Sequence, residues 1–351
     1  MPIPDTLRAL LQAHGPSGYE TAPARVFADA AAAFAEVSTD VMGSTWARVK
    51  GTGDGPTLAI MGHIDEIGVI VTHVEDDGFL RFTGVGGWDP QILVGQRVEV
   101  RGKDGLVPGV VGRKPIHLLE ADQRKKVVEL KGLHIDVGAS DRDEAAELIR
   151  VGDPVVIAAE PMAVAGGRLV SRAMDNRLGA YVALESLRRC NERDGPGGSF
   201  AAVAAVQEEI GLFGARTAAF EVRPDLAVAV DVTHATDAPG VDEKEIGSHP
   251  LGSGPAIGRG STLSPKVFEL LVETAEAEGI EHSIAASGRG TSTDADVLQI
   301  SRAGIPTGLV SIPLRYMHSP VEMVDLRDVE ATVQLLAAFA ARLTADVDLS
   351  R

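Results

Sequence analysis

A chain of 351 residues is longer than one hydrophobic core usually supports, so its length predicts two domains. The net charge of −17 argues against a nucleic-acid partner, because phosphates attract basic surfaces. No apolar run approaches the roughly 18 residues of a membrane span, which argues against a membrane partner. A single cysteine leaves no intrachain disulfide and no thiolate metal site. The first residues lack the pattern of a signal peptide, so we expect a cytoplasmic protein.

The N-terminal segment predicts two helices followed by a strand. Apolar residues within 5–13 have helical spacing, and glycine and proline then interrupt the pattern. Ser17 and Glu20 match a capping box, which predicts the start of a second helix. A brief apolar strand over residues 57–61 ends at His63.

From about residue 68 to residue 167 the chain consists of short β-rich segments separated by turn sequences such as Asp76-Asp77-Gly78. That pattern predicts a small all-β module, either a barrel or a sandwich. Residues 68–168 carry 13 Lys and Arg against 16 Asp and Glu, whereas the remainder carries 20 against 34. Because interface cores are depleted of unpaired charge, the β module is the better candidate for a contact between copies.

After residue 168 the sequence alternates between helical and strand patterns. Strand patterns cover residues 201–206, 226–230 and 308–312, and helical patterns cover residues 175–193, 266–278 and 326–343. The simplest organisation is one α/β domain formed by residues 1–67 and 169–351, interrupted by a β domain at 68–168.

The first candidate site residues follow the predicted strand that ends at His63. His63 and Asp65 are two residues apart, so their side chains leave the same side of the strand. Asp65 is therefore placed to accept a hydrogen bond from the ring nitrogen of His63 that does not bind metal. The alternative is a capped strand end with an incidental ion pair.

Asp175 begins the predicted helix at 175–193, and an N-cap aspartate is one reading of it. Asn176 beside it has no capping role, which favours a functional site in which the Asp175 carboxylate bridges two ions. Glu208 and Glu209 follow a buried strand and diverge, so one can bind metal while the other acts as general base. Two solvated loop glutamates are the alternative reading.

Asp231 ends the predicted strand at 226–230, and His318 follows residues 315–317 near the last strand. Histidines and carboxylates without a thiolate are typical ligands of a hydrolytic zinc or cobalt site. More carboxylates are present than one ion needs, which predicts two divalent ions, zinc first, with cobalt or manganese as alternatives. The sequence therefore predicts a dinuclear metallohydrolase.

With these motifs the chain resembles the tetrahedral aminopeptidases, dinuclear metallopeptidases that include glutamyl, leucyl and lysyl aminopeptidases and some proteins described as cellulase-like. The resemblance covers nearly all 351 residues. Besides the site motifs, it rests on the segments at residues 15–20, 290–295 and 312–322.

The resemblance implies a zinc-peptidase fold, a mixed sheet flanked by helices with an inserted barrel-like domain for oligomerisation. It implies that Asp175 bridges the metals, with His63 and Asp231 on one ion and Glu209 and His318 on the other. It makes Glu208 the general base and Asp65 the residue that orients His63. It also implies a cis Asp175–Asn176 peptide bond and a homododecamer built from dimers.

The expected function is removal of N-terminal residues from short peptides, by a hydroxide held between two metal ions with Glu208 as its general base. A deacylase or another amidohydrolase of small amides is the alternative, and a non-catalytic metal-binding scaffold is another. Cellulase activity is discounted, because glycosidases place two carboxylates across a sugar and need no histidine ligands.

Overall fold

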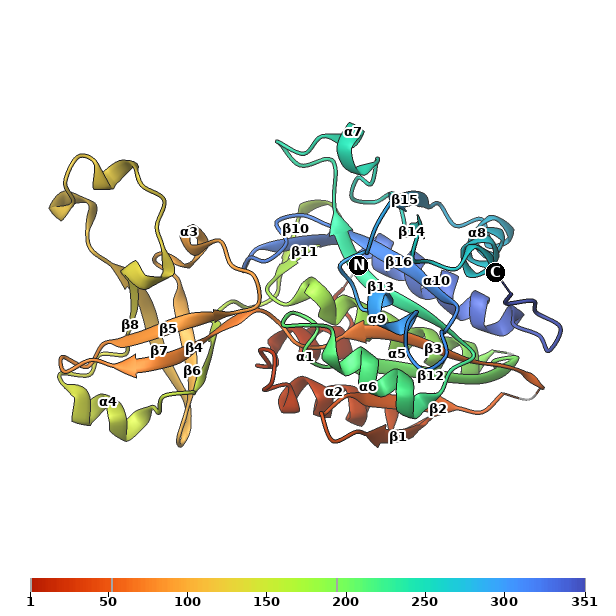
Figure 1. Ribbon diagram of the computed structural model, residues 1–351, viewed down its shortest axis with the longest axis horizontal. Coiled ribbons are helices and arrows are strands. Elements are labelled where there is room, and N and C mark those ends of the chain that lie inside the picture. The colour runs from red at the N-terminus through yellow and green to blue at the C-terminus, as the bar shows by residue number, and fades with distance from the viewer. Residues whose placement is uncertain (1, 52, 194, 351) are drawn as a thin grey trace.

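The structure is a computed structural model that describes residues 2–51, 53–193 and 195–350. It consists of an α/β body and a smaller β-barrel that projects from one side of it, at the left of Figure 1. Both chain termini lie on the α/β body (Figure 1).

The α/β body is built on an eight-stranded mixed sheet whose four central strands, β12, β3, β13 and β16, are parallel to one another. Short apolar runs form these strands, as expected for strands that are covered on both faces. In spatial order the strands are β1 (Glu36–Thr39), β2 (Thr45–Val49), β12 (Gly198–Ala205), β3 (Gly55–His63), β13 (Leu226–His234), β16 (Thr307–Leu314), β14 (Ala256–Gly260) and β15 (Ser283–Ser287).

Helices cover both faces of this sheet. Successive side chains of each strand point to opposite sides, and here the side chains on both sides are apolar and need to be buried. In β3, Leu58 and Ile60 belong to the larger core, which is formed with helices α1 (Asp5–Gln12), α2 (Thr21–Ala31), α5 (Met174–Glu192), α8 (Pro265–Glu278) and α10 (Leu326–Arg342). The alternate residues Ala59 and Met61 pack in a smaller core with α6 (Phe213–Val222) and α9 (Ala295–Leu298).

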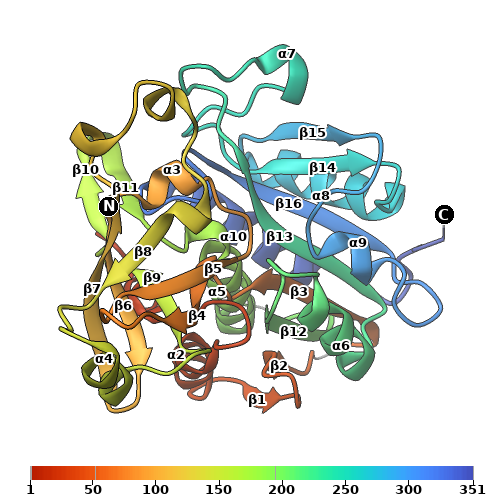
Figure 2. The ribbon, with the colours of Figure 1, turned by 60° about the vertical axis from the view of Figure 1, so that its left-hand side comes forward.

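The inserted module is a closed barrel with a core of its own. Of the two expectations for this region, the barrel is therefore correct and the sandwich is not. In spatial order its strands are β4 (Gly68–Val74), β5 (Leu80–Val85), β8 (Leu133–Asp136), β7 (Gly105–Arg113), β6 (Arg97–Gly102) and β9 (Pro154–Ile157), and two short helices accompany them, α3 (Pro90–Leu93) and α4 (Arg142–Leu148). Figure 2 views the same molecule with the barrel turned toward the reader.

A separate three-stranded sheet joins the segment that follows the barrel to the C-terminal part of the chain. Its order is β10 (Met162–Val164), β11 (Arg168–Ser171) and β17 (Glu322–Asp325). A further short helix, α7 (Glu243–Ile246), lies on a loop that extends from the α/β body (Figure 1). The predicted fold, a mixed sheet flanked by helices with an inserted barrel, is confirmed. Among the described residues, no helix is both long and apolar enough to cross a lipid bilayer.

The predicted capping box at Ser17 and Glu20 is wrong. Helix α2 begins at Thr21 without a side-chain cap. Ser17 Oγ instead donates to Asp65 Oδ2 at 2.6 Å, and Glu20 Oε1 accepts the main-chain N–H groups of Gly18 and Gln207 at 2.7 and 3.1 Å. Both side chains thus bond to segments that are distant in the sequence, and neither caps the helix that the local sequence pattern predicted.

Candidate metal centre

The carboxyl ends of the parallel strands bring the predicted site residues to one edge of the sheet. Strand β3 ends at His63, strand β12 leads to Glu208 and Glu209, and Asp231 lies within β13. Asp175 at the start of α5 and His318 in the loop after β16 complete the cluster. All seven residues selected from the sequence, including Asp65, therefore lie together.

Asp175 lies between the two histidines. Its Oδ1 is 3.1 Å from His63 Nε2, and its Oδ2 is 3.3 Å from His318 Nε2. It is not the N-cap of α5, because Ala173 holds that position and Asp175 has non-helical backbone angles. The peptide bond between Asp175 and Asn176 is cis, as the resemblance implied. Each carboxylate oxygen thus faces a different imidazole.

Asn176 ties the start of α5 to the neighbouring strand. Its Nδ2 donates to the carbonyl of Val230 at 2.7 Å, and its Oδ1 accepts the N–H of Gly179 at 2.9 Å. Because Val230 directly precedes Asp231, this side chain fixes the position of Asp175 relative to Asp231.

Glu208 and Glu209 point in different directions, as expected for consecutive residues after a strand. Glu208 Oε2 lies 3.7 Å from His63 Nε2, whereas Glu209 Oε1 lies 3.3 Å from His318 Nε2. Asp231 Oδ1 is 4.0 Å from His63 Nε2. Two groups of side chains are close enough to hold a metal ion, His63 with Asp175 and Glu209, and His63 with Glu208 and Asp231.

Asp65 is fully buried and contacts two of the ligand-bearing segments at once. Its Oδ1 lies 3.3 Å from His63 Nδ1 and accepts the main-chain N–H of Glu208 at 3.1 Å. Its Oδ2 accepts the N–H of Glu209 at 3.2 Å and the hydroxyl of Ser17. The contact with His63 was expected from the sequence, whereas the contacts with the two glutamate N–H groups were not.

The backbone is strained where it carries the site. Four of the eight non-glycine residues with positive φ in the described chain are Ala173, Gln207, Tyr316 and His318, each within two residues of a candidate ligand or of Glu208. Left-handed conformations are unfavourable for residues with a Cβ and persist where surrounding contacts enforce them. They cluster at functional sites, which supports such a role for these three loops.

The cluster holds more buried negative charge than the protein alone neutralises. Burial raises the pKa of Glu208 to about 9, with the charges of Asp231 and Asp294 adding to the effect, and burial raises the pKa of Asp231 well above its ordinary range. Contacts with Asp175 and Glu209 raise the pKa of His318 to about 11.

The donor atoms of this cluster fit divalent cations. Imidazole nitrogens and carboxylate oxygens are the ligand types that zinc, cobalt and manganese accept. Glu209 Oε1 is buried without a hydrogen-bond partner in the described chain, and three further carboxylates surround His63 Nε2 within 4.0 Å. Cations would supply the missing partners and balance the charge.

Sequence reasoning assigned no role to two buried carboxylates at this site. Glu322 accepts main-chain N–H groups beside Asp175 and at His318, while burial and the charge of Asp175 raise its pKa well above the usual range. Asp294 has no hydrogen-bond partner for either oxygen in the described chain, and burial raises its pKa to about 7. Both residues lie in segments that carry the family resemblance, which was the available signal, but Met174 and Asp175, which donate to Glu322, are distant from it in sequence.

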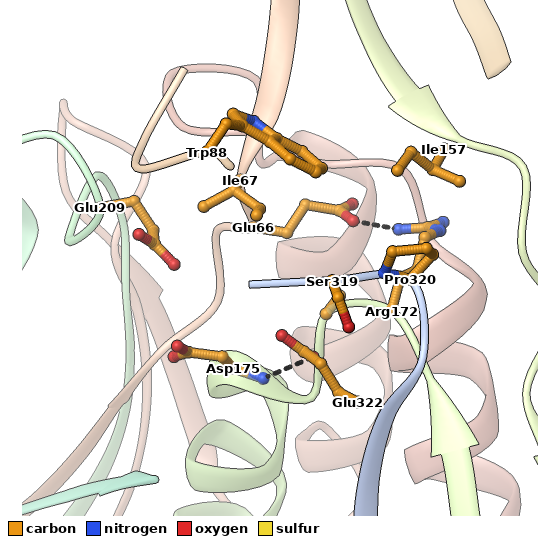
Figure 3. A pocket seen from close by; sticks show the side chains of 11 residues that line it. Glu66, Ile67, Trp88, Ile157, Arg172, Asp175, Glu209, Ser319, Pro320 and Glu322 are labelled. Atoms are coloured by element: carbon orange, nitrogen blue, oxygen red, sulfur yellow. Dashed lines mark hydrogen bonds and ion pairs between the residues drawn. The ribbon is translucent and has the colours of Figure 1, made fainter. Parts of the chain in front are cut away.

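The barrel contributes to the walls of the site. Figure 3 shows the cavity beside Asp175 and Glu209, with Trp88 and Ile157 from the barrel region facing the ion pair between Glu66 and Arg172. The carbonyl of Gly87 lies 2.9 Å from His318 Nδ1. Because a carbonyl only accepts, Nδ1 must carry a proton, so in the neutral ring Nε2 is the nitrogen left free to bind a metal.

Comparison with known proteins places these features in a family. A model of the family described as M42 glutamyl aminopeptidase matches residues 43–335. The lysyl aminopeptidase of Pyrococcus furiosus is 35% identical over 346 residues, 97% of each chain. A TET aminopeptidase from Thaumarchaeota archaeon SCGC AB-539-E09 has a TM-score of 0.92 at 35% identity, covering 98% of this chain and 97% of its own.

A third similar protein is the TET1 peptidase of Pyrococcus horikoshii, which can assemble into a tetrahedron or a large octahedral shell. It has a TM-score of 0.85 at 32% identity, covering 97% of this chain and 99% of its own. Similarity to all three proteins thus extends over nearly the whole chain, including the barrel.

Proposed function

This chain belongs to the M42 glutamyl aminopeptidase family and is an aminopeptidase; from that premise we propose that it removes N-terminal residues from short peptides with two divalent ions. The observation that carries the proposal is the position of Asp175, whose two oxygens face His63 and His318 separately. A carboxylate placed in this way is suited to bridge two ions.

The proposed ligand sets divide the cluster into two halves that share Asp175. His63 and Asp231 hold one ion, and Glu209 and His318 hold the other. Distances of 3.3 Å from His318 Nε2 to both Asp175 and Glu209 support the second set, and the proximity of His63 to Asp175 and Asp231 supports the first. Zinc is the proposed metal, with cobalt and manganese as alternatives of similar ligand preference.

When bound, the ions supply Lewis acidity at the scissile carbonyl and lower the pKa of the attacking water. Glu208 accepts the proton of that water and donates it to the leaving amine. Its carboxylate reaches to 3.7 Å from His63 Nε2, while its main-chain N–H is held by Asp65. The Glu208 carboxylate thus lies beside the proposed ligands but belongs to neither proposed ligand set.

The test separates the base from its neighbouring ligand. Glu208→Gln should abolish hydrolysis of aminoacyl arylamides while two ions stay bound, because only proton transfer is removed. Glu209→Gln should lose one ion, as measured by metal analysis after dialysis. Loss of metal in Glu208→Gln with both ions kept in Glu209→Gln would reverse the assignment.

A substrate panel separates this function from its alternative. The wild-type enzyme should cleave aminoacyl arylamides and leave N-acetyl amino acids intact, because an aminopeptidase acts beside a free α-amino group. Preferential cleavage of the N-acetyl compounds would instead indicate a deacylase.

We also propose that residues 68–168 form an inserted domain that mediates oligomerisation, while residues 1–67 and 169–351 form the catalytic domain. Exposed apolar side chains support this role, and within the barrel region they include Leu106, Ile116, Leu118 and Val127. The similarity to a peptidase that assembles into a tetrahedron supports a homododecamer built from dimers. A cytoplasmic location remains the prediction from the sequence.

A further inference from the structure

One buried carboxylate joins the two segments that carry Asp175 and His318. Glu322 Oε2 accepts the main-chain N–H of Met174 at 2.7 Å and that of Asp175 at 3.2 Å. Its other oxygen, Oε1, accepts the N–H of His318 at 2.9 Å. Figure 3 shows the Glu322 side chain directed toward the start of α5, beside Asp175. The residue is 2% exposed, so water does not compete for these contacts.

The loop that carries His318 needs such support. Tyr316 and His318 both have left-handed backbone conformations, with φ of 61° and 59°. Main-chain hydrogen bonds between Arg315 and Met323, each 3.0 Å, close the base of the loop. Glu322 accepts a hydrogen bond from the main chain of His318, the residue whose imidazole faces Asp175. Ser319 Oγ, which donates to the carbonyl of Tyr316 and accepts the N–H of Val321, supports the same loop from within, and Glu322 supports the main chain of His318 itself.

The register of the small sheet places Glu322 where it can reach both segments. Glu322 lies opposite Ser171 in the antiparallel pair of β17 with β11. Strand β11 ends at Ser171, and only Arg172 and Ala173 separate it from α5, so the same pairing that positions Glu322 also positions the start of α5. The carboxylate therefore connects the main chain at Asp175 with the main chain at His318.

We propose that Glu322 is a positioning residue that holds Asp175 and His318 in register, so that the ion shared by Asp175, Glu209 and His318 depends on it. The inference rests on the two-ion function proposed above. Glu322 would not contact that ion or the substrate. It would act only through the main chain of the two ligands.

The substitution Glu322→Gln tests this role with little change of volume. An amide offers one acceptor and one NH2 group, so it cannot accept from both segments. If the amide oxygen faces Met174 and Asp175, it keeps the hydrogen bonds from their two N–H groups. The NH2 group then faces the N–H of His318, so that two donors oppose each other. The loop at His318 should therefore shift, while His63 and Asp231 keep their positions.

Asp328→Asn is the matched control. Asp328 is equally buried and accepts two main-chain N–H groups, those of Gly252 and Gly254 at 2.7 and 2.8 Å, in a region without proposed ligands. A purely structural role for Glu322 predicts that both variants lose similar stability and bind metal alike. A positioning role predicts that only the Glu322 variant changes its metal content.

The experiment measures zinc content after dialysis, the affinity for each ion by calorimetry, and the thermal midpoint of the metal-free protein. Wild type and Asp328→Asn should hold two ions. Glu322→Gln should hold one, with affinity for the second reduced about 10- to 100-fold, the range seen when residues that orient ligands are changed. Glu322→Asp, which keeps the carboxyl group but withdraws it by one methylene, should show the same selective loss and serves if the Gln variant does not fold.

The outcomes separate this inference from the proposed function. Two ions at wild-type affinity in a folded Glu322 variant would overturn the inference and leave the two-ion function standing. Equal loss of metal in the Asp328 control would also overturn it, because the effect would then be a general one. Fewer than two ions in the wild type would contradict the proposed function and the inference together.

Discussion

Asp65 accepts the main-chain N–H of Glu208 at 3.1 Å through Oδ1, the same oxygen that lies 3.3 Å from His63 Nδ1. One buried atom thus sets the position of the proposed general base relative to a proposed ligand. The ion-pair and hydrogen-bond contacts of Asp65 lower its pKa against the effect of burial, so the carboxylate stays charged at neutral pH.

Replacing Asp65 with Asn should reduce kcat by about 10- to 100-fold, because an amide cannot accept from both glutamate N–H groups and from His63 as well. Ser17→Ala is the milder comparison, since it removes only the hydroxyl that donates to Asp65 Oδ2 at 2.6 Å. Steady-state kinetics and metal analysis of both variants check the prediction. Equal activities of Asp65→Asn and wild type would show that the Asp65 contacts do not govern the site.

Metal binding should release protons and strengthen as the pH rises. In the metal-free protein, Asp175 and Glu209 raise the pKa of His318 from 6.5 to about 11, so the protonated imidazole stabilises the fold fully below pH 6.5. That contribution is lost as the pH rises toward 11. A metal needs the neutral imidazole, so binding must displace this proton between those values. Calorimetry in buffers of different ionisation enthalpy measures the release, and binding without proton release at pH 7.5 would contradict the prediction.

Arg177→Ala should destabilise the protein severely. Arg177 is fully buried, pairs with Glu66 at 2.9 Å and donates to the carbonyls of Leu10, Ala13 and Ile64. Removing one partner of a buried pair costs about 3–5 kcal/mol. In this variant Glu66 would keep only Arg172 as an ion-pair partner, and the three carbonyls would lose this donor.

Arg188→Ala is the control for this prediction. Arg188 pairs with Glu185 and Glu192 on the surface of α5, where its side chain is 38% exposed, so its loss should cost at most about 1 kcal/mol. Urea midpoints of the metal-free variants compare the two costs. Similar midpoints for Arg177→Ala and Arg188→Ala would mean that the buried network contributes little.

The assembled protein should be much larger than one chain. Twelve copies of 36.7 kDa give a particle of about 440 kDa, and closed symmetry makes that size finite. Sedimentation with metal present should report this mass, with dimers appearing after metal removal. A monomer with full activity under the same conditions would refute the assembly and leave the site chemistry unaffected.

Part of the candidate site could be predicted from sequence because several of its residues follow recognisable apolar strand patterns. His63, Glu208 and Asp231 each follow an apolar run, and parallel strands must end at one edge of a sheet. The clustering of these residues could therefore be predicted from local strand patterns together with the rule that sites lie at the carboxyl ends of parallel strands. The division into two proposed ligand sets did not follow from those patterns, because it depends on distances between segments.

The remaining features depend on contacts between distant segments. Ser17 and Glu20 carried a local helix-cap signal, but their partners Asp65 and Gln207 lie far along the chain and prevailed. Short β-rich segments separated by turn sequences predicted a β module without deciding between a barrel and a sandwich, since closure depends on the pairing of β4 with β9. Glu322 gave no local signal of its contacts with Met174 and Asp175.

The hydrogen bond between Gly87 and His318 links the orientation of an imidazole to the position of the barrel region. Gly87 lies in the inserted barrel region, whereas His318 lies in the α/β body, and 2.9 Å separates the two atoms. Hydrogen bonds weaken steeply when their angle departs from linear, so a tilt of the barrel by a small angle would rotate or release the ring. The position of the barrel relative to the α/β body therefore contributes to the orientation of the His318 ring.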